Sequence, residues 1–316
     1  MLAGGASRAE QFDDFWKITV GMGAEGRTFT KTRLELTERD DYSPRNALTA
    51  VAQSATKLII FGGQDSTQER QFNDLYVLDL ETNELRHHEY ADGAITPPIR
   101  NSHTLSQGGN GKAYLFGGAN SDGPLKDLYE LDLATLIFTR VQLDETEMNL
   151  PMIEMHTAHI YQGTHILLIG GRKLEIGQPM DSIAFSDDIY SIELATGKVS
   201  LFGRLPTECG SHVSAIVDDQ YLVLYGGTNG LRFFDTILRY EIATKEWTLM
   251  TKQPVDLINS PFFSDGRIAA CAAQFGNDFG LFFGGCSAER DCNDTLVVSF
   301  SHIRDSANFS VITEIF

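Results

Sequence analysis

The sequence is short of cysteine and of basic residues. Its 316 residues include 4 cysteines, and 25 lysines and arginines stand against 43 aspartates and glutamates, which gives a formal charge of −18. Four cysteines are too few for a disulfide scaffold, so we expect a reducing compartment, the cytoplasm or the nucleus. A phosphate backbone would repel a chain this acidic, so general binding to nucleic acid is disfavoured.

Long apolar runs are also missing. No run approaches the roughly 18 residues that a membrane helix needs, so membrane insertion is not expected. Residues 1–5 carry neither the basic end nor the apolar stretch of a signal peptide. The 42% of hydrophobic residues against 22% of charged ones argues against a fully disordered chain. A folded, globular chain is therefore expected.

A repeat organises this chain. An apolar segment ending in Gly-Gly recurs at intervals of 53 to 58 residues. The six pairs are Gly4-Gly5, Gly62-Gly63, Gly117-Gly118, Gly170-Gly171, Gly226-Gly227 and Gly284-Gly285. Evenly spaced copies of one unit indicate a repeat architecture. A phosphate-binding loop would need a helix after the glycines, and nothing helical follows them, so the glycines are interpreted as structural.

Each repeat reads as four short strands, labelled a to d. Strand b is the apolar run before Gly-Gly, and a polar b–c segment then leads to an Asp that opens strand c. The Asp residues are Asp14, Asp74, Asp127, Asp188, Asp235 and Asp294. Alternation such as Tyr76-Val77-Leu78-Asp79-Leu80 is typical of strands rather than helices. Four antiparallel strands per repeat of about 50 residues predict a β-propeller.

Gly-Gly after strand b, an aromatic in strand c and an aromatic or Trp in strand d resemble the Kelch repeat. The resemblance covers essentially the whole chain, although the strand-d Trp is clear only at Trp247 and Ile237 and Leu296 replace the strand-c aromatic. It implies an all-β, six-bladed propeller in a single domain, 1–316. The expected blades are approximately 1–36, 45–90, 100–143, 153–204, 209–251 and 267–316. Blade 1 lacks its inner strand, and whether residues upstream supply it stays open.

Alternating strand direction places the b–c and d–a segments on one face, and these segments vary most in length. We therefore expect the binding face there. The longest b–c segment, residues 172–186, is the loop candidate for partner binding, with Arg172 and Lys173 as its basic residues.

Three arginines share one register of the innermost strand. Arg45, Arg100 and Arg267 each lie 17 residues before the first Gly of a pair, where the other repeats have Ile153 and Cys209. Arginine binds carboxylates through paired donors, so a ring of arginines at the channel mouth favours an acidic peptide as ligand. The Kelch resemblance implies the same role. The alternative is that each arginine braces the neighbouring blade, and both interpretations stay open.

Three histidines share a second register, at His103, His156 and His212. A metal site is conceivable, but no carboxylate or cysteine shares the register, and the Kelch resemblance implies a structural role. Neither a metal nor another cofactor is expected. Cys286 and Cys292 share one b–c segment, where free thiols are the simpler interpretation.

The sequence thus predicts a non-catalytic protein–protein interaction module, an adaptor or scaffold. The partner is a protein or peptide, an acidic peptide if the arginines face the channel; a basic partner held by the acidic surface is a second reading. The alternative function is a small-molecule enzyme with its site at the channel mouth, such as a sugar epimerase. The oligomeric state does not follow from the sequence.

Overall fold

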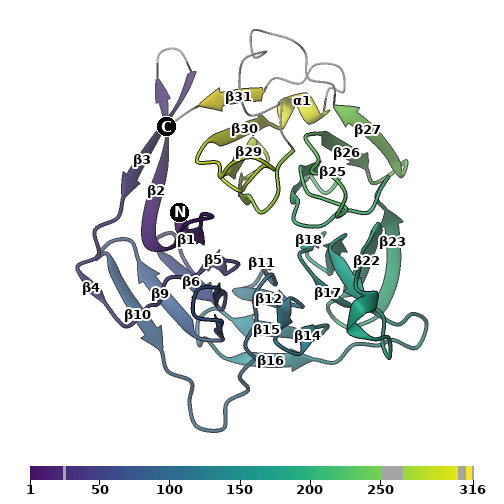
Figure 1. The fold of residues 1–316 in the computed structure, drawn as a ribbon, viewed down its shortest axis with the longest axis horizontal. Helices are drawn as coiled ribbons and strands as arrows, with labels where there is room; N and C mark the ends of the chain where they lie inside the picture. Colours follow the sequence, from purple (N-terminus) through teal and green to yellow (C-terminus); the bar gives the residue numbers. More distant parts are fainter. Residues whose placement is uncertain (24–25, 251–265, 305–310, 315–316) are drawn as a thin grey trace. The chain divides into compact units, whose positions relative to one another are not determined.

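The computed structural model describes residues 1–23, 26–250, 266–304 and 311–314. The chain divides into two compact units, Met1–Gln142 and Leu143–Phe316. Each unit consists of sheets that are antiparallel except for one short parallel strand in the first unit, coloured from purple to yellow along the chain in Figure 1. None of the described helices is long and apolar enough to cross a membrane.

The first unit contains one sheet for each of repeats 1 to 3. Repeat 1 forms the sheet β1-β2-β3, from β1 (Leu2–Ala6), β2 (Gln11–Gly23) and β3 (Gly26–Arg33). Repeat 2 forms β5 (Thr49–Ala52), β6 (Lys57–Phe61), β9 (Leu75–Asp79) and β10 (Glu84–His88). Repeat 3 forms β11 (Thr104–Gln107), β12 (Lys112–Phe116), β15 (Leu128–Asp132) and β16 (Phe138–Val141).

The second unit contains the sheets of repeats 4 to 6. Repeat 4 forms β18 (Thr157–Tyr161), β19 (His165–Ile169), β22 (Asp188–Glu193) and β23 (Val199–Arg204). Repeat 5 forms β24 (Val213–Val217), β25 (Tyr221–Tyr225), β26 (Ile237–Glu241) and β27 (Glu246–Met250). Repeat 6 forms β28 (Cys271–Phe275), β29 (Phe279–Phe283), β30 (Thr295–Ser299) and β31 (Val311–Glu314), with the short helix α1 (Ser301–Arg304) between the last two.

The strand order a-b-c-d predicted from the sequence is the order found in the sheets of repeats 3 to 6. Repeat 1 has three strands among the described residues, so its inner strand is missing as expected. Repeat 2 departs from the prediction, because β4 (Glu38–Arg39) adds a fifth strand parallel to β10. This strand covers the outer edge of the sheet, which would otherwise present unpaired backbone groups.

The b–c segments fold more regularly than the sequence suggested. Short hairpins form in repeat 2, from β7 (Gln64–Asp65) and β8 (Arg70–Gln71), and in repeat 3, from β13 (Ala119–Asn120) and β14 (Gly123–Pro124). The segment 172–186, expected to be a long loop, contains β20 (Arg172–Leu174), the 3-10 helix η1 (Met180–Ser182) and β21 (Ala184–Phe185). With β17 (Met152–Glu154) these strands make a small sheet of their own.

The hydrophobic core lies between neighbouring sheets. Phe61 and Leu75 of repeat 2 pack in one cluster with Leu115, Tyr129 and Phe138 of repeat 3. An equivalent cluster joins repeats 5 and 6 in the second unit. Each fully buried aromatic or aliphatic side chain of this kind contributes about 1.5–3 kcal/mol, so the stacking of sheets stabilises each unit.

The Gly-Gly pairs connect one repeat to the next. The second glycine donates its backbone N–H to the carbonyl of the residue that opens the following repeat, as from Gly63 to Arg100 (3.0 Å) and from Gly227 to Arg267 (2.7 Å). At Gly118 the φ angle is +85°, and a Cβ would lie 2.4 Å from the carbonyl oxygen of Asn101. Glycine is therefore required there both by conformation and by space.

We expect Gly118→Ala to lower the free energy of unfolding by about 2 kcal/mol more than Gly111→Ala. Both glycines belong to repeat 3 and have positive φ, but a Cβ at Gly111 would meet nothing within 4 Å. The comparison therefore separates the steric clash from the backbone strain. Chemical denaturation of both variants measures the difference in their free energies of unfolding. Equal losses in the two variants would contradict the close-approach argument.

Candidate functional site

The three register arginines are buried and paired. Arg45, Arg100 and Arg267 are 1%, 0% and 3% exposed. Arg100 donates from Nη1 and Nη2 to the two carboxylate oxygens of Asp127, each at 2.8 Å. Each of the three binds, in the same way, the Asp that opens strand c of its own repeat.

The same guanidinium groups also hold the backbone. Nη1 of Arg100 donates to the carbonyl of Gly117 at 2.9 Å, and Nε donates to the carbonyl of Pro98 at 3.1 Å. Arg45 repeats this pattern with Gly62 and Ser43, so the arginine ties the d–a segment to strands b and c.

This geometry corrects the expectation that Arg45, Arg100 and Arg267 form a partner-binding ring at a channel mouth. Their Nη groups donate inside the repeat, and their burial leaves almost no guanidinium surface for a ligand. The missed signal was the Asp that opens strand c, 29, 27 and 27 residues after these arginines. The contacts support a bracing role, but inside the arginine's own repeat and not towards the neighbouring blade as the alternative supposed.

Repeats 4 and 5 lack the arginine. In repeat 5, Cys209 takes its place, where its Sγ lies 3.6 Å from the carbonyl of Gly226 and burial raises its pKa to about 12. A thiol with so high a pKa is a poor nucleophile at neutral pH.

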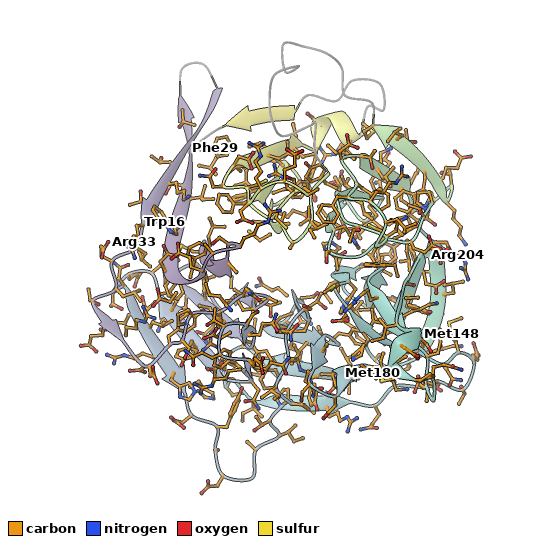
Figure 2. All side chains as sticks on the ribbon, in the orientation of Figure 1. Trp16, Phe29, Arg33, Met148, Met180 and Arg204 are labelled. Atoms are coloured by element: carbon orange, nitrogen blue, oxygen red, sulfur yellow. The ribbon has the colours of Figure 1, made fainter. Side chains whose placement is uncertain are left out.

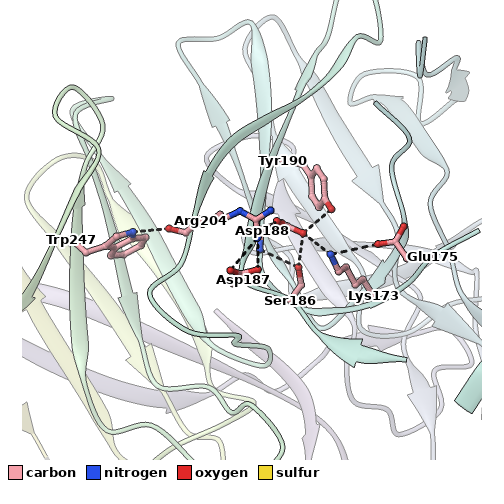
Figure 3. A network of polar contacts seen from close by, with 8 residues as sticks. All are labelled: Lys173, Glu175, Ser186, Asp187, Asp188, Tyr190, Arg204 and Trp247. Atoms are coloured by element: carbon pink, nitrogen blue, oxygen red, sulfur yellow. Dashed lines mark hydrogen bonds and ion pairs between the residues drawn. The ribbon is translucent and has the colours of Figure 1, made fainter. Parts of the chain in front are cut away.

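In repeat 4, Ile153 stands at the register, and Lys173 supplies the missing cation from the b–c segment. Figure 3 shows Lys173, Tyr190 and Arg204 around the buried carboxylate of Asp188. Lys173 Nζ lies 2.6 Å from Asp188 Oδ2, and Tyr190 donates to the same oxygen at 2.9 Å. Burial alone would raise the pKa of Asp188, but these two hydrogen bonds and the positive charges of Lys173 and Arg204 outweigh it, and the pKa is lowered. In repeat 4, a lysine from the b–c segment thus binds the Asp that opens strand c, as the arginine does in repeats 2, 3 and 6.

Arg172 and Lys173, the expected loop site, are both engaged within the chain. Arg172 donates to Glu154, and Lys173 also lies 3.5 Å from Glu175. Their side chains are about one-third and one-quarter exposed, at 35% and 25%. Both charges have carboxylate partners within the chain, and a role of Arg172 and Lys173 in partner binding stays a prediction.

The register histidines take part in hydrogen bonds between inner strands. His103 Nε2 lies 2.8 Å from Thr49 Oγ1, and His212 Nε2 lies 2.9 Å from Thr157 Oγ1. Within the described residues, no group of three or more His, Cys, Asp or Glu side chains is placed to hold a metal ion. The hydrogen bonds of His103 and His212 support their structural interpretation.

His159, which the sequence analysis did not select, extends this network. Its Nε2 lies 2.7 Å from Ser214 Oγ, and Ser214 donates to Thr157 Oγ1 at 2.6 Å. Burial lowers the pKa of His159 to about 4 and those of His156 and His212 to about 3. These three histidines are neutral at pH 7.

Exposed apolar side chains gather on the b–c segments of repeats 4 and 5. Ile176 is 55% exposed, Met180 in η1 is 49% exposed (Figure 2), and Leu231 is 92% exposed. The two segments are in contact, because Phe185 of β21 packs beside both Gly210 and Gly230 of repeat 5.

The turn that carries Leu231 is held by its own hydrogen bonds. Asn229 Oδ1 accepts from the backbone N–H groups of Leu231 (3.1 Å) and Arg232 (3.2 Å). Thr228 Oγ1 accepts from the N–H of Gly230 (3.0 Å) and donates to the carbonyl of Arg232 (2.8 Å). Leu231 is therefore presented to solvent by an ordered turn, and sequence periodicity gave no sign of it because the turn is irregular.

Comparison with known proteins places the chain in one family. The KLHDC2/KLHL20/DRC7 Kelch-repeats domain matches residues 1–198, and the Kelch motif matches residues 209–254. The chain is 24% identical over 183 residues to Kelch domain-containing protein 10 of Xenopus tropicalis, covering 52% of this chain and 42% of that protein. It is 26% identical over 184 residues to acyl-CoA-binding domain-containing protein 4 of Arabidopsis thaliana, covering 57% of this chain and 26% of that protein.

The chain thus spans less than half the length of these curated relatives. Kelch-repeat domains generally mediate protein–protein interaction and are typically non-enzymatic. The matched domain covers more than half of the sequence, and the sheets are those of its repeats. The chain belongs to the Kelch-repeat family and has its β-propeller fold.

Proposed function

We propose that this chain is a non-catalytic adaptor or scaffold module that binds a partner protein through the b–c segments of repeats 4 and 5. The observation that carries the proposal is Leu231, a 92% exposed leucine on a turn fixed by side-chain hydrogen bonds. A turn that is ordered before binding loses little conformational entropy on association. Ile176 and Met180 supply further apolar surface on the neighbouring segment.

The partner that fits this surface is a protein with an apolar socket for Leu231. Arg232, also exposed and stacked 5.1 Å from the Phe234 ring, favours a carboxylate at the rim of that socket. We therefore still propose an acidic segment in the partner, now because of Arg232 and no longer because of the buried register arginines. The net charge of −18 repels an acidic segment at long range, so the apolar contact carries the affinity.

We further propose that the six repeat sheets belong to one six-bladed propeller spanning residues 1–316. The even spacing of the Gly-Gly pairs supports this, as do the family matches over residues 1–198 and 209–254. We place the protein in the cytoplasm or the nucleus, on its low cysteine content.

Leu231→Ser is expected to weaken partner binding at least about tenfold, because burying a leucine is worth about 1.5–3 kcal/mol. The matched control is Leu249→Ser, which changes a 54% exposed leucine on strand β27 of the same repeat. Quantitative affinity capture from the native cell with the wild type and both variants would identify the partner, and titration of that purified partner gives the affinities.

A partner lost with Leu231→Ser and kept with Leu249→Ser supports the proposal. Equal capture by all three proteins would move the binding surface elsewhere on the chain. Equal loss with both variants would point to a general effect of removing surface leucines.

A further inference from the structure

A polar hollow of about 250 Å³ lies in the first unit, whereas Leu231 belongs to the second. The d–a segment 41–45, the b–c residues 70–74, Tyr76 of β9 and His87 of β10 line it. Tyr76 and His87 are a cross-strand pair with ring centroids 5.1 Å apart, so one wall of the hollow is fixed by the sheet.

The basic side chains of the lining already have partners. Arg45 binds Asp74, and His87 Nδ1 lies 3.0 Å from Glu89 Oε1. Arg70 stacks 5.0 Å from the Phe72 ring and lies opposite Asp65 in the β7–β8 hairpin.

The acceptors of the lining are less fully used. Gln71 Oε1 is buried and accepts no hydrogen bond from the residues that the structure describes. Asn73 donates from Nδ2 to the carbonyl of Pro97 at 2.9 Å, which fixes the orientation of the amide and leaves Oδ1 as an acceptor. Asp41 is exposed, and its carboxylate makes no ion pair among the described residues. Gln71 Oε1 is a buried acceptor without a donor, which is costly, and Asn73 Oδ1 and the Asp41 carboxylate are further acceptors of the lining, so the hollow suits a ligand rich in N–H donors.

We propose that this hollow binds the guanidinium of an arginine side chain from a partner protein. A guanidinium brings five donors in one plane, which suits the acceptors of Asp41, Gln71 and Asn73. Its flat face can stack on an aromatic ring, as Arg45 does at 4.4 Å from Tyr42 and 3.8 Å from Phe72.

The charge of the chain supports the same occupant. With a net charge of −18, the protein attracts basic partners over distances of about a Debye length. A single basic side chain of the partner then binds beside Asp41. The inference rests on the proposed role in protein binding and adds the chemistry of one contact. Leu231 and Asp41 belong to different units, so variants at each test the two proposals separately.

The test uses the full chain and a short probe, acetyl-Gly-Arg-Gly-amide, followed by NMR of the backbone amides. We expect shifts at residues 41–45 and 70–74 with a Kd on the order of 1 mM, as befits a single side chain. The peptide with citrulline, the neutral isostere of arginine, should bind at least about fivefold more weakly, and the lysine peptide should fall between them.

Asp41→Asn should weaken binding of the arginine peptide about fivefold, while Asp92→Asn, an exposed Asp on the following d–a segment, should leave it unchanged. Both sites are exposed, so neither variant threatens folding. Equal binding of the arginine and citrulline peptides would overturn the proposal. So would an unchanged affinity in Asp41→Asn, or no shift at 41–45 and 70–74 up to about 20 mM probe.

Discussion

Arg100→Ala is expected to lower the free energy of unfolding by about 3–5 kcal/mol, because it leaves a paired carboxylate without its cation. The arginine is 0% exposed, and it donates to Asp127, Gly117 and Pro98. Truncation removes these hydrogen bonds together and leaves a cavity where the buried guanidinium lay. Chemical denaturation of the purified variant measures the loss.

Two further variants make this expectation specific. Arg140→Ala removes an exposed arginine from β16 of the same sheet, and its effect should be within about 0.5 kcal/mol of zero. The double variant Arg100→Met, Asp127→Leu should recover much of the loss, since replacing both ions of a buried pair with apolar side chains is often neutral. A loss under about 1 kcal/mol in Arg100→Ala would show that the pair is not a structural clamp.

The second large effect is expected on acidification. The free energy of unfolding should fall between pH 7 and pH 5 by about 2 kcal/mol for each of the histidines 156, 159 and 212. Their folded pKa values are about 3, 4 and 3, below the ordinary 6.5, because burial disfavours the charged imidazolium.

The direction follows from proton uptake. Below pH 6.5 the unfolded chain protonates these histidines and the folded chain does not, so the unfolded state binds more protons and gains stability as the pH falls. The contribution is fully present above pH 6.5 and is lost progressively down to the folded values. Aspartates with a lowered pKa, such as Asp188, change the free energy of unfolding mainly below their ordinary pKa of 3.8. The change between pH 7 and pH 5 therefore comes from the histidines.

His212→Gln should reduce the slope of unfolding free energy against pH by about 1.4 kcal/mol per pH unit between pH 6 and 5. His165→Gln is the matched control, because His165 in β19 is only partly buried and hydrogen-bonds the neighbouring Thr164. Denaturation curves at several pH values give the slopes. The same slope in the wild type and in His212→Gln would mean that His212 is not buried in its neutral form.

Much of the fold could be read from local pattern. The Gly-Gly spacing located all six repeats, and alternation after each Asp placed strand c. The segment 172–186 was misread as an open loop, since β20 and β21 are too short to show a period and pair with each other and with β17. The parallel strand β4 was missed for the same reason, because two residues carry no pattern of their own.

By itself, the sequence determined the all-β repeat fold, because glycine pairs and strand periodicity are local patterns that recur in each repeat. It left the roles of Arg45, Arg100 and Arg267 undecided, because a guanidinium serves equally as a ligand group or a clamp. Tertiary structure decided for the clamp by bringing each arginine against an Asp 27 to 29 residues away and burying the arginine. It also decided where apolar surface is exposed, at Leu231, because solvent exposure depends on which segments pack together rather than on residue type.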